Sequence, residues 1–180
     1  MLRITIPANE FYDESTNQFI KVKEQTLQLE HSLVSLSKWE SQWCKPFISR
    51  HKMTIEESRD YVRCMTLTQN VPPETYYGLT DQNLEEIRAY IDAPMTALRF
   101  PAEEKGKINR EPITSELIYF WMITLNIPLE CQKWHLNKLI ALIKLCDHKN
   151  RPAKKLSPQE VARRNAEINA ANKKYFNTKG

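Results

Sequence analysis

The hydrophobic pattern of this chain changes its period once, just after His31. Before that point apolar and polar residues alternate, in residues 2–6 and again in residues 26–30. A period of two places the apolar side chains on one face of a sheet. The first 32 residues therefore predict a small antiparallel β-hairpin or meander, with its first turn at residues 13–17.

After His31 the apolar positions recur every three or four residues, which is the period of α-helices. Several predicted helices begin with a capping box, in which a hydroxyl side chain and a glutamate three residues later satisfy each other's backbone donors. We expect boxes at Ser37 with Glu40, Thr54 with Glu57 and Ser157 with Glu160, and single caps at Thr80 or Asp81 and at Thr114. These signals indicate five to six helices after the β-region.

One predicted helix, over residues 117–125, is apolar around its whole circumference. Such a helix is typical of the centre of a core, so we expect Trp121 within it to be buried. A second helix, over residues 129–146, carries a single apolar stripe. The proline at position 128 separates the two, which predicts a helical hairpin at the heart of the domain.

These elements predict an α+β, mainly α fold, in which a small N-terminal antiparallel β-hairpin or meander is followed by a bundle of five to six helices. We divide the chain into a β-region packed on the body (1–32), a helical body (33–149) and a basic linker with a C-terminal helix (150–180). Residues 147–180 hold nine basic and three acidic residues, whereas the rest of the chain holds 17 and 19. Because the last region also has few apolar residues, we expect it to be flexible and separable.

The sequence lacks the patterns that carry catalysis or hold cofactors. Its three glycines are scattered, which excludes phosphate-binding loops and nucleophile elbows. Adjacent glutamates at 56–57 and 85–86 lie in the first turns of predicted helices, where they complement the helix dipole. Cys131 and His135 would share a helix face, but no second pair of metal ligands accompanies them. We therefore expect no enzymatic activity, no cofactor and no metal.

The four cysteines lie far apart, and no two of them form a CxxC pair. We interpret them as reduced thiols that serve as small apolar side chains. The N-terminus lacks the apolar stretch of a signal peptide. The longest strongly apolar run has nine residues, whereas about 20 are needed to span a bilayer. We expect neither export nor contact with a membrane.

Three aromatic residues at helical spacing, Trp39, Trp43 and Phe47, are candidates for a partner-binding surface, because tryptophan is enriched at binding hot spots. An aromatic stripe of this spacing is more often part of a core, and the core reading is favoured. In the C-terminal region, three basic doublets are compatible with nucleic-acid binding. They are spread along the chain with few stacking aromatics nearby, which favours a solvated helix and argues against a nucleic-acid partner.

Five short blocks have distinctive residue orders: SLSKWESQW at 35–43, YVRCMT at 61–66, ITSELIYFWM at 113–122, NIP at 126–128 and CQKWHLN at 131–137. Together they resemble the tail assembly chaperone family of tailed bacteriophages of the siphophage type. The resemblance implies a non-enzymatic protein that binds the hydrophobic tape measure protein and keeps it soluble during assembly of the tail tube. It also implies a place in the cytoplasm of the infected bacterial cell and absence from the mature virion.

Binding of this kind requires an apolar groove or the free edge of a strand. The edges of the N-terminal strands also allow self-association of the chain. Two alternatives remain open from the sequence. The first is a virion structural protein of the tail or neck, and the second is a nucleic-acid-associated adaptor that acts through the basic C-terminal tail.

Overall fold

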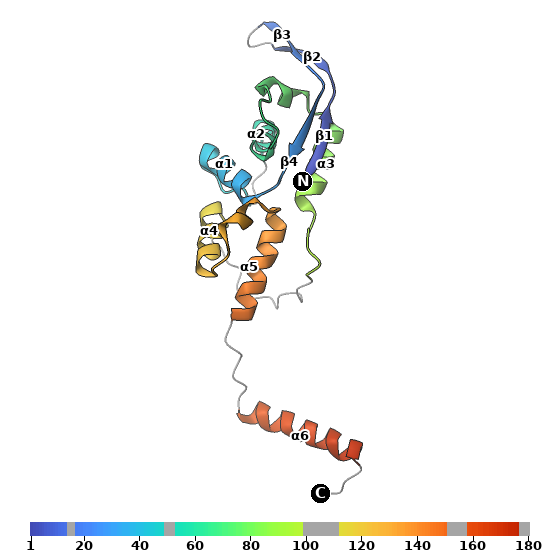
Figure 1. Cartoon of the computed structure of the whole chain (residues 1–180), viewed down its shortest axis with the longest axis vertical. Coiled ribbons are helices and arrows are strands. Elements are labelled where there is room, and N and C mark those ends of the chain that lie inside the picture. Colours follow the sequence, from blue (N-terminus) through green and yellow to red (C-terminus); the bar gives the residue numbers. More distant parts are fainter. Residues whose placement is uncertain (14–16, 49–52, 99–111, 151–157, 177–180) are drawn as a thin grey trace. The chain divides into compact units, whose positions relative to one another are not determined.

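The computed structural model describes residues 1–13, 17–48, 53–98, 112–150 and 158–176 (Figure 1). The predicted cap at Ser157 lies outside these residues. The chain divides into two compact units, Met1–Asp147 and His148–Gly180. The first unit holds a β-ribbon followed by helices, and the α+β, mainly α fold class is confirmed.

The N-terminal strands form one long antiparallel hairpin in two paired segments. β1 (Leu2–Ile6) pairs with β4 (Gln25–Leu29), and β2 (Asn9–Asp13) pairs with β3 (Gln18–Val22). Ile6 lies opposite Gln25 and Asn9 lies opposite Val22, so two residues on each strand separate the segments and the register continues unchanged. The interruption coincides with Pro7, which has no backbone N–H to donate to a partner strand.

Opposite faces of the ribbon pack against the body before and after this interruption. Ile6 is fully buried, and Phe11 on the next strand also packs against the core, although strict alternation would place these two on opposite faces. The strong twist of a two-stranded ribbon accounts for this change in the face that packs against the body. As a result Tyr12 and Phe19, whose ring centroids are 5.1 Å apart, form an exposed cross-strand pair.

The helices follow in the order α1 (Leu33–Trp43), α2 (Ile55–Met65), the 3₁₀ helix η1 (Pro73–Gly78), α3 (Asp81–Asp92), α4 (Ser115–Thr124), the 3₁₀ helix η2 (Leu129–Lys133), α5 (Leu136–Asn150) and α6 (Pro158–Phe176). Three predicted starts are confirmed. Thr54 and Glu57 form a capping box on α2, Thr80 caps α3 and Thr114 caps α4.

The predicted capping box at Ser37 is wrong. α1 begins earlier, at Leu33, and its cap is Ser32, whose side chain accepts a hydrogen bond from the backbone N–H of Ser35. The Ser35 hydroxyl in turn accepts one from the backbone N–H of Ser32, at 2.8 Å. Serine thus takes the place that glutamate occupies in the usual box, and Glu40 is left free for a different contact.

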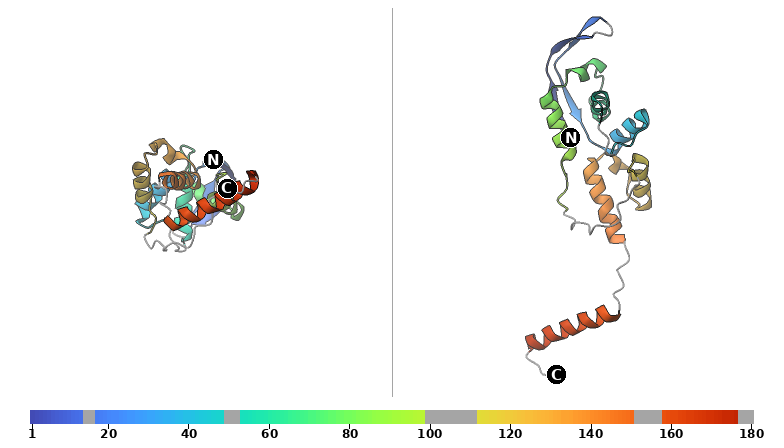
Figure 2. Two further views of the ribbon diagram at one scale, coloured as in Figure 1. Left: turned by 90° about the horizontal axis from the view of Figure 1, so that it is seen from below. Right: turned by 180° about the vertical axis from the view of Figure 1, so that it is seen from behind.

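Buried apolar residues form two clusters that share α1. The first cluster packs the ribbon against α1, α2, η1 and α3, and includes Trp39. The second packs α1 against α4, η2 and α5, and includes Leu33 and Leu36. Views from the front and from behind show α1 beside both α2 and α4 (Figures 1 and 2). Residues on different faces of one helix therefore hold the two clusters together.

α4 is not the helix buried on all sides that its composition predicts. Ile118 and Met122 are fully buried, whereas Phe120 is 61% exposed and Ile123 is 67% exposed. Trp121, predicted to be central, is half-buried. The buried residues of α4 pack with α1 and α5, so α4 lies along one side of the second cluster.

The helix predicted over residues 129–146 is divided in two. η2 ends at Lys133 and α5 begins at Leu136. Between them, His135 forms a β-bridge with Ser32, and the backbone N–H of Leu136 donates a 2.7 Å hydrogen bond to the carbonyl of His31. Backbone contacts with a distant segment thus replace the helical bonds that local sequence alone would suggest.

α6 belongs to the second unit, and all of its described side chains are exposed. The separability of residues 150–180 from the body stays a prediction. Within the described ranges, no helix combines the length and the apolar content that a membrane-spanning helix requires.

Candidate functional site

An apolar groove of about 490 Å³ opens between α2 and α3 and is the strongest candidate for a binding site. One wall is the face of α2 that carries Ile55, Ser58, Arg59 and Val62. Ser58 and Arg59 follow Ile55 by three and four positions, and Val62 follows them by four and three, so all four lie along one face of the helix. Ile55 and Val62 are the apolar members of this wall, and Ile55 at its start is 77% exposed.

The opposite wall is the face of α3 that carries Asp81, Leu84, Arg88 and Ile91, again at helical spacing. Ile87 from α3 is buried at the base of the groove, together with Tyr61 and Val62 of α2. Tyr77 and Leu79 line it from η1 and the residue that follows, and Phe47 and Met53 line it from the connection between α1 and α2.

Two arginines face this groove from opposite walls. The Arg59 guanidinium lies 4.2 Å from the centre of the Tyr77 ring, a cation–π contact that holds it beside the apolar surface. Neither Arg59 nor Arg88 forms an ion pair with a described residue. Asp81 is the acidic member of the lining and lies in the first turn of α3, where it complements the helix dipole.

The three predicted partner-binding residues take different places around this groove. Trp39 is fully buried, and its Nε1 donates a 2.9 Å hydrogen bond to the backbone carbonyl of Glu57. It belongs to the core, as the favoured reading predicted, and cannot contact a partner while the domain stays folded. Phe47 lines the groove, with its ring centroid 4.0 Å from that of Tyr61.

Trp43 lies in a neighbouring hollow between α1, α2 and η1 rather than in the groove itself. It is half-buried, and its Nε1 donates a 2.9 Å hydrogen bond to Oδ2 of Asp60. Sequence reasoning did not identify the α3 wall. The sequence did hold a signal for this wall. Ile87 and Tyr90 account for the buried face of α3, so Leu84 and Ile91 form an additional apolar edge on the same helix.

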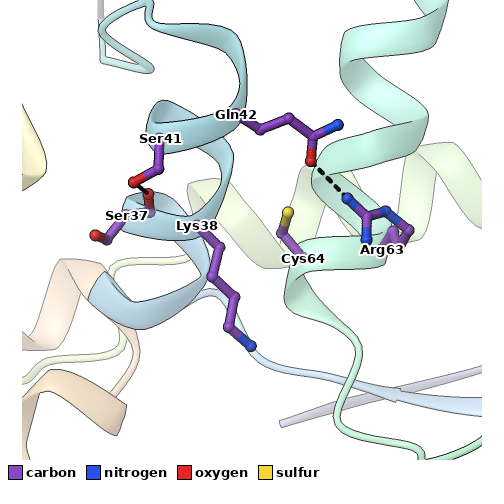
Figure 3. Close-up of a pocket in the computed structure, with 6 residues that line it drawn as sticks. All are labelled: Ser37, Lys38, Ser41, Gln42, Arg63 and Cys64. Carbon is purple, nitrogen blue, oxygen red and sulfur yellow. Dashed lines mark hydrogen bonds between the residues drawn. The ribbon is translucent and has the colours of Figure 1, made fainter.

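A second, polar pocket of about 540 Å³ lies between α1 and α2 (Figure 3). Its lining residues are Ser37, Lys38, Ser41, Gln42, Arg63 and Cys64. Arg63 donates a 2.6 Å hydrogen bond to the Gln42 side chain, and the Ser41 hydroxyl donates to the carbonyl of Ser37. Burial raises the pKa of the Cys64 thiol to about 11, and the nearby Asp60 carboxylate adds to this. A protonated thiol is a poor nucleophile, so this pocket offers hydrogen-bonding groups rather than an activated cysteine.

The cysteines have unequal environments. Cys131 is buried, Cys64 and Cys146 are half-buried, and all four have free thiols. Cys44 is exposed at the C-terminal end of α1, with a left-handed backbone (φ 50°). The interpretation of the cysteines as apolar packing residues therefore fits Cys131 and is wrong for Cys44.

The prediction that Cys131 and His135 share a helix face is also wrong. Cys131 lies in η2, whereas His135 follows that helix and is buried instead of exposed. Its Nε2 lies 3.0 Å from the carbonyl oxygen of Tyr90 and therefore donates a hydrogen bond to it. Among the described residues, no group of three His, Cys, Asp or Glu side chains could hold a metal ion.

His135 forms part of a buried histidine pair at the junction of the two apolar clusters. The ring centroids of His31 and His135 are 5.1 Å apart, and Nδ1 of His31 hydrogen-bonds with the Tyr61 hydroxyl. Burial lowers the pKa of His31 to about 3, with a further contribution from His135, and burial also lowers the pKa of His135. Both rings are therefore neutral near pH 7, and they join the clusters through contacts that depend on this neutrality.

Comparison of the chain with models of protein families, with curated proteins and with solved structures gives no match. The candidate site therefore rests on the geometry of the groove. Its walls supply apolar contact surface and two arginine side chains, which is the chemistry of a binding surface.

Proposed function

We propose that this protein is a non-enzymatic tail assembly chaperone of a tailed bacteriophage, which binds the hydrophobic tape measure protein and keeps it soluble while the tail tube assembles. The observation that carries the proposal is the apolar groove between α2 and α3, open at the surface of a folded body. The resemblance of five sequence blocks to this family supports the same function.

The groove suits a chaperone because of the free energy gained when apolar surface leaves water, about 25 cal/mol for each Å² buried. Ile55 is 77% exposed and Tyr77 is 53% exposed, so both have apolar area for a partner to cover. An exposed apolar patch of this kind is typical of protein-binding sites. Each contact is weak, but many copies along one long partner gain from avidity.

Further apolar side chains are exposed on other elements, among them Phe120 and Ile123 on α4 and the Tyr12–Phe19 pair on the ribbon. They offer additional contact points for a long partner or for a second copy of the chain. Self-association through the N-terminal strands remains part of the proposal. The proposed setting is the cytoplasm of the infected bacterial cell, with the protein absent from the finished virion.

The test is co-expression of the chain with the candidate tape measure protein of the same genome. The tape measure protein alone should be insoluble, and the chain should move most of it into the soluble fraction and co-purify with it. Equal insolubility with and without the chain would refute the proposal. Abundant copies of the chain in purified particles would instead favour a structural protein of the tail or neck.

A further inference from the structure

The walls of the groove have the length and spacing of a helix-binding surface. Along α2 the lining residues run from Ile55 to Val62, about 10 Å of helix, and along α3 from Asp81 to Ile91, about 15 Å. An occupant helix of about three turns would match this length. In helix-in-groove recognition the occupant's apolar anchors recur at every third or fourth position, and the two walls offer Ile55, Val62, Leu84 and Ile91 as apolar contacts for them.

The arginines add a charge preference to this apolar surface. Arg59 and Arg88 flank the groove from opposite walls, and neither is neutralised by an ion pair with a described carboxylate. Asp60, beside Arg59 in the chain, already accepts hydrogen bonds from Arg63 and Trp43. Glutamate or aspartate beside the apolar stripe of an occupant would therefore meet two available guanidinium groups, against the single carboxylate of Asp81 among the described lining residues.

From this geometry we infer that the groove between α2 and α3 binds an amphipathic helix whose apolar stripe is flanked by acidic residues, with Arg59 and Arg88 as the charge-selecting contacts. The inference rests on the proposed function and names the surface and the partner chemistry that the chaperone would use. A basic occupant is disfavoured. The exposed helix α6 is of that kind, since its doublets Arg163-Arg164 and Lys173-Lys174 outnumber Glu160 and Glu167.

The test measures binding of defined peptides to the full-length chain by fluorescence anisotropy. One peptide of about three turns carries leucines at helical spacing with glutamates beside them, and its isomer carries lysines in place of the glutamates. The acidic peptide should bind about tenfold more tightly. This advantage should shrink as NaCl rises from about 50 mM to about 500 mM, since salt screens exposed charges.

Arg88→Glu is the decisive variant, because Arg88 is exposed and its replacement should leave the fold intact. It should weaken binding of the acidic peptide about tenfold and improve binding of the basic one. Ile55→Gln should weaken the binding of both peptides, since it removes an apolar contact that each of them would make. Arg164→Glu, which reverses an exposed charge on α6, is the matched control and should change neither affinity.

Equal affinity for the two peptides, or indifference to Arg88→Glu, would overturn the inference. So would a concentration-dependent dimer that Arg88→Glu dissociates, because a second copy would then fill the groove. The co-expression assay separates this inference from the proposed function. If the Arg88→Glu chain solubilises the tape measure protein as well as the native chain does, the charge-selecting role assigned to the groove is wrong and the chaperone function stands. If the native chain binds the acidic peptide but not the tape measure protein, the inference about the groove stands and the chaperone function is wrong.

Discussion

The carboxylate of Glu40 joins segments 75 residues apart, because its Oε2 accepts a 2.7 Å hydrogen bond from the backbone N–H of Ser115. Its Oε1 accepts a second, 2.8 Å bond from the backbone N–H of Phe47. Glu40 is 7% exposed, so both bonds are shielded from water. An anion at the first turn of α4 complements the helix dipole. The same side chain therefore anchors α4 and positions Phe47 at the end of the groove.

Glu40→Gln should destabilise the domain by about 1–3 kcal/mol, because the amide has one acceptor oxygen and leaves a buried N–H without a partner. The measurement is the midpoint of urea unfolding, followed by circular dichroism. Glu85→Gln, an exposed position on α3, is the control and should shift the midpoint little. An unchanged midpoint in Glu40→Gln would show that water replaces these bonds at no cost.

Stability should fall as the pH drops below about 6.5, where histidine in the unfolded chain begins to bind a proton. The pKa of His31 is lowered to about 3 in the folded protein, so the folded ring stays neutral and the unfolded state gains protons first. The loss should approach about 1.4 kcal/mol per pH unit for this histidine, and it continues toward the folded pKa.

Urea unfolding between pH 7 and pH 5 tests this, because most carboxylates remain ionised in that range. His31→Gln should reduce the pH dependence, although it lowers stability at pH 7, and the part that comes from the lowered pKa of His135 should remain. A midpoint that does not move between pH 7 and pH 5 in the native chain would contradict the assignment of a buried neutral imidazole.

Trp39→Ala should cost about 3–5 kcal/mol, since it removes a fully buried indole from the first cluster. Trp121→Ala should cost less, because Trp121 is half-buried. Phe120→Ala, at a side chain 61% exposed, should stay within about 0.5 kcal/mol. Thermal and urea unfolding of the three variants would give this order, and a reversal of Trp39 and Trp121 would contradict the arrangement of the two clusters.

Thiol labelling of the native protein at pH 7 should show one fast cysteine, Cys44, because it is the exposed one of the four. Cys131 should react only on unfolding. Cys64 should react slowly, since its pKa of about 11 leaves little thiolate at neutral pH. Cys44→Ser should remove the fast phase, and four thiols should react in denaturant without a reductant. A fast phase that persists in Cys44→Ser would place a second cysteine at the surface.

Several features follow from residues close together in the sequence. The alternation of residues 2–6 and 26–30 predicts paired strands, and Pro7 accounts for the interruption between their two segments. The box formed by Thr54 and Glu57 and the caps at Thr80 and Thr114 mark true helix starts. These features are predictable because strand alternation and capping depend on backbone groups within about four residues.

Other features depend on which distant segment packs against each face. Composition suggested that α4 is central, yet α1 and α5 cover one side of it and Phe120 stays exposed. The sequence predicts His135 on the surface of a helix, but backbone pairing with Ser32 buries it.

The groove also depends on distant segments. Its walls come from α2 and α3, which are separate in the sequence, and their exposed edges form one surface only when both helices pack on the ribbon. The sequence by itself thus determined the starts of α2, α3 and α4 and which residues are apolar, whereas contacts with distant segments set the division between η2 and α5. Only the tertiary structure decided which apolar residues are buried and which remain at the surface to bind a partner, because burial is set by neighbours from far along the chain.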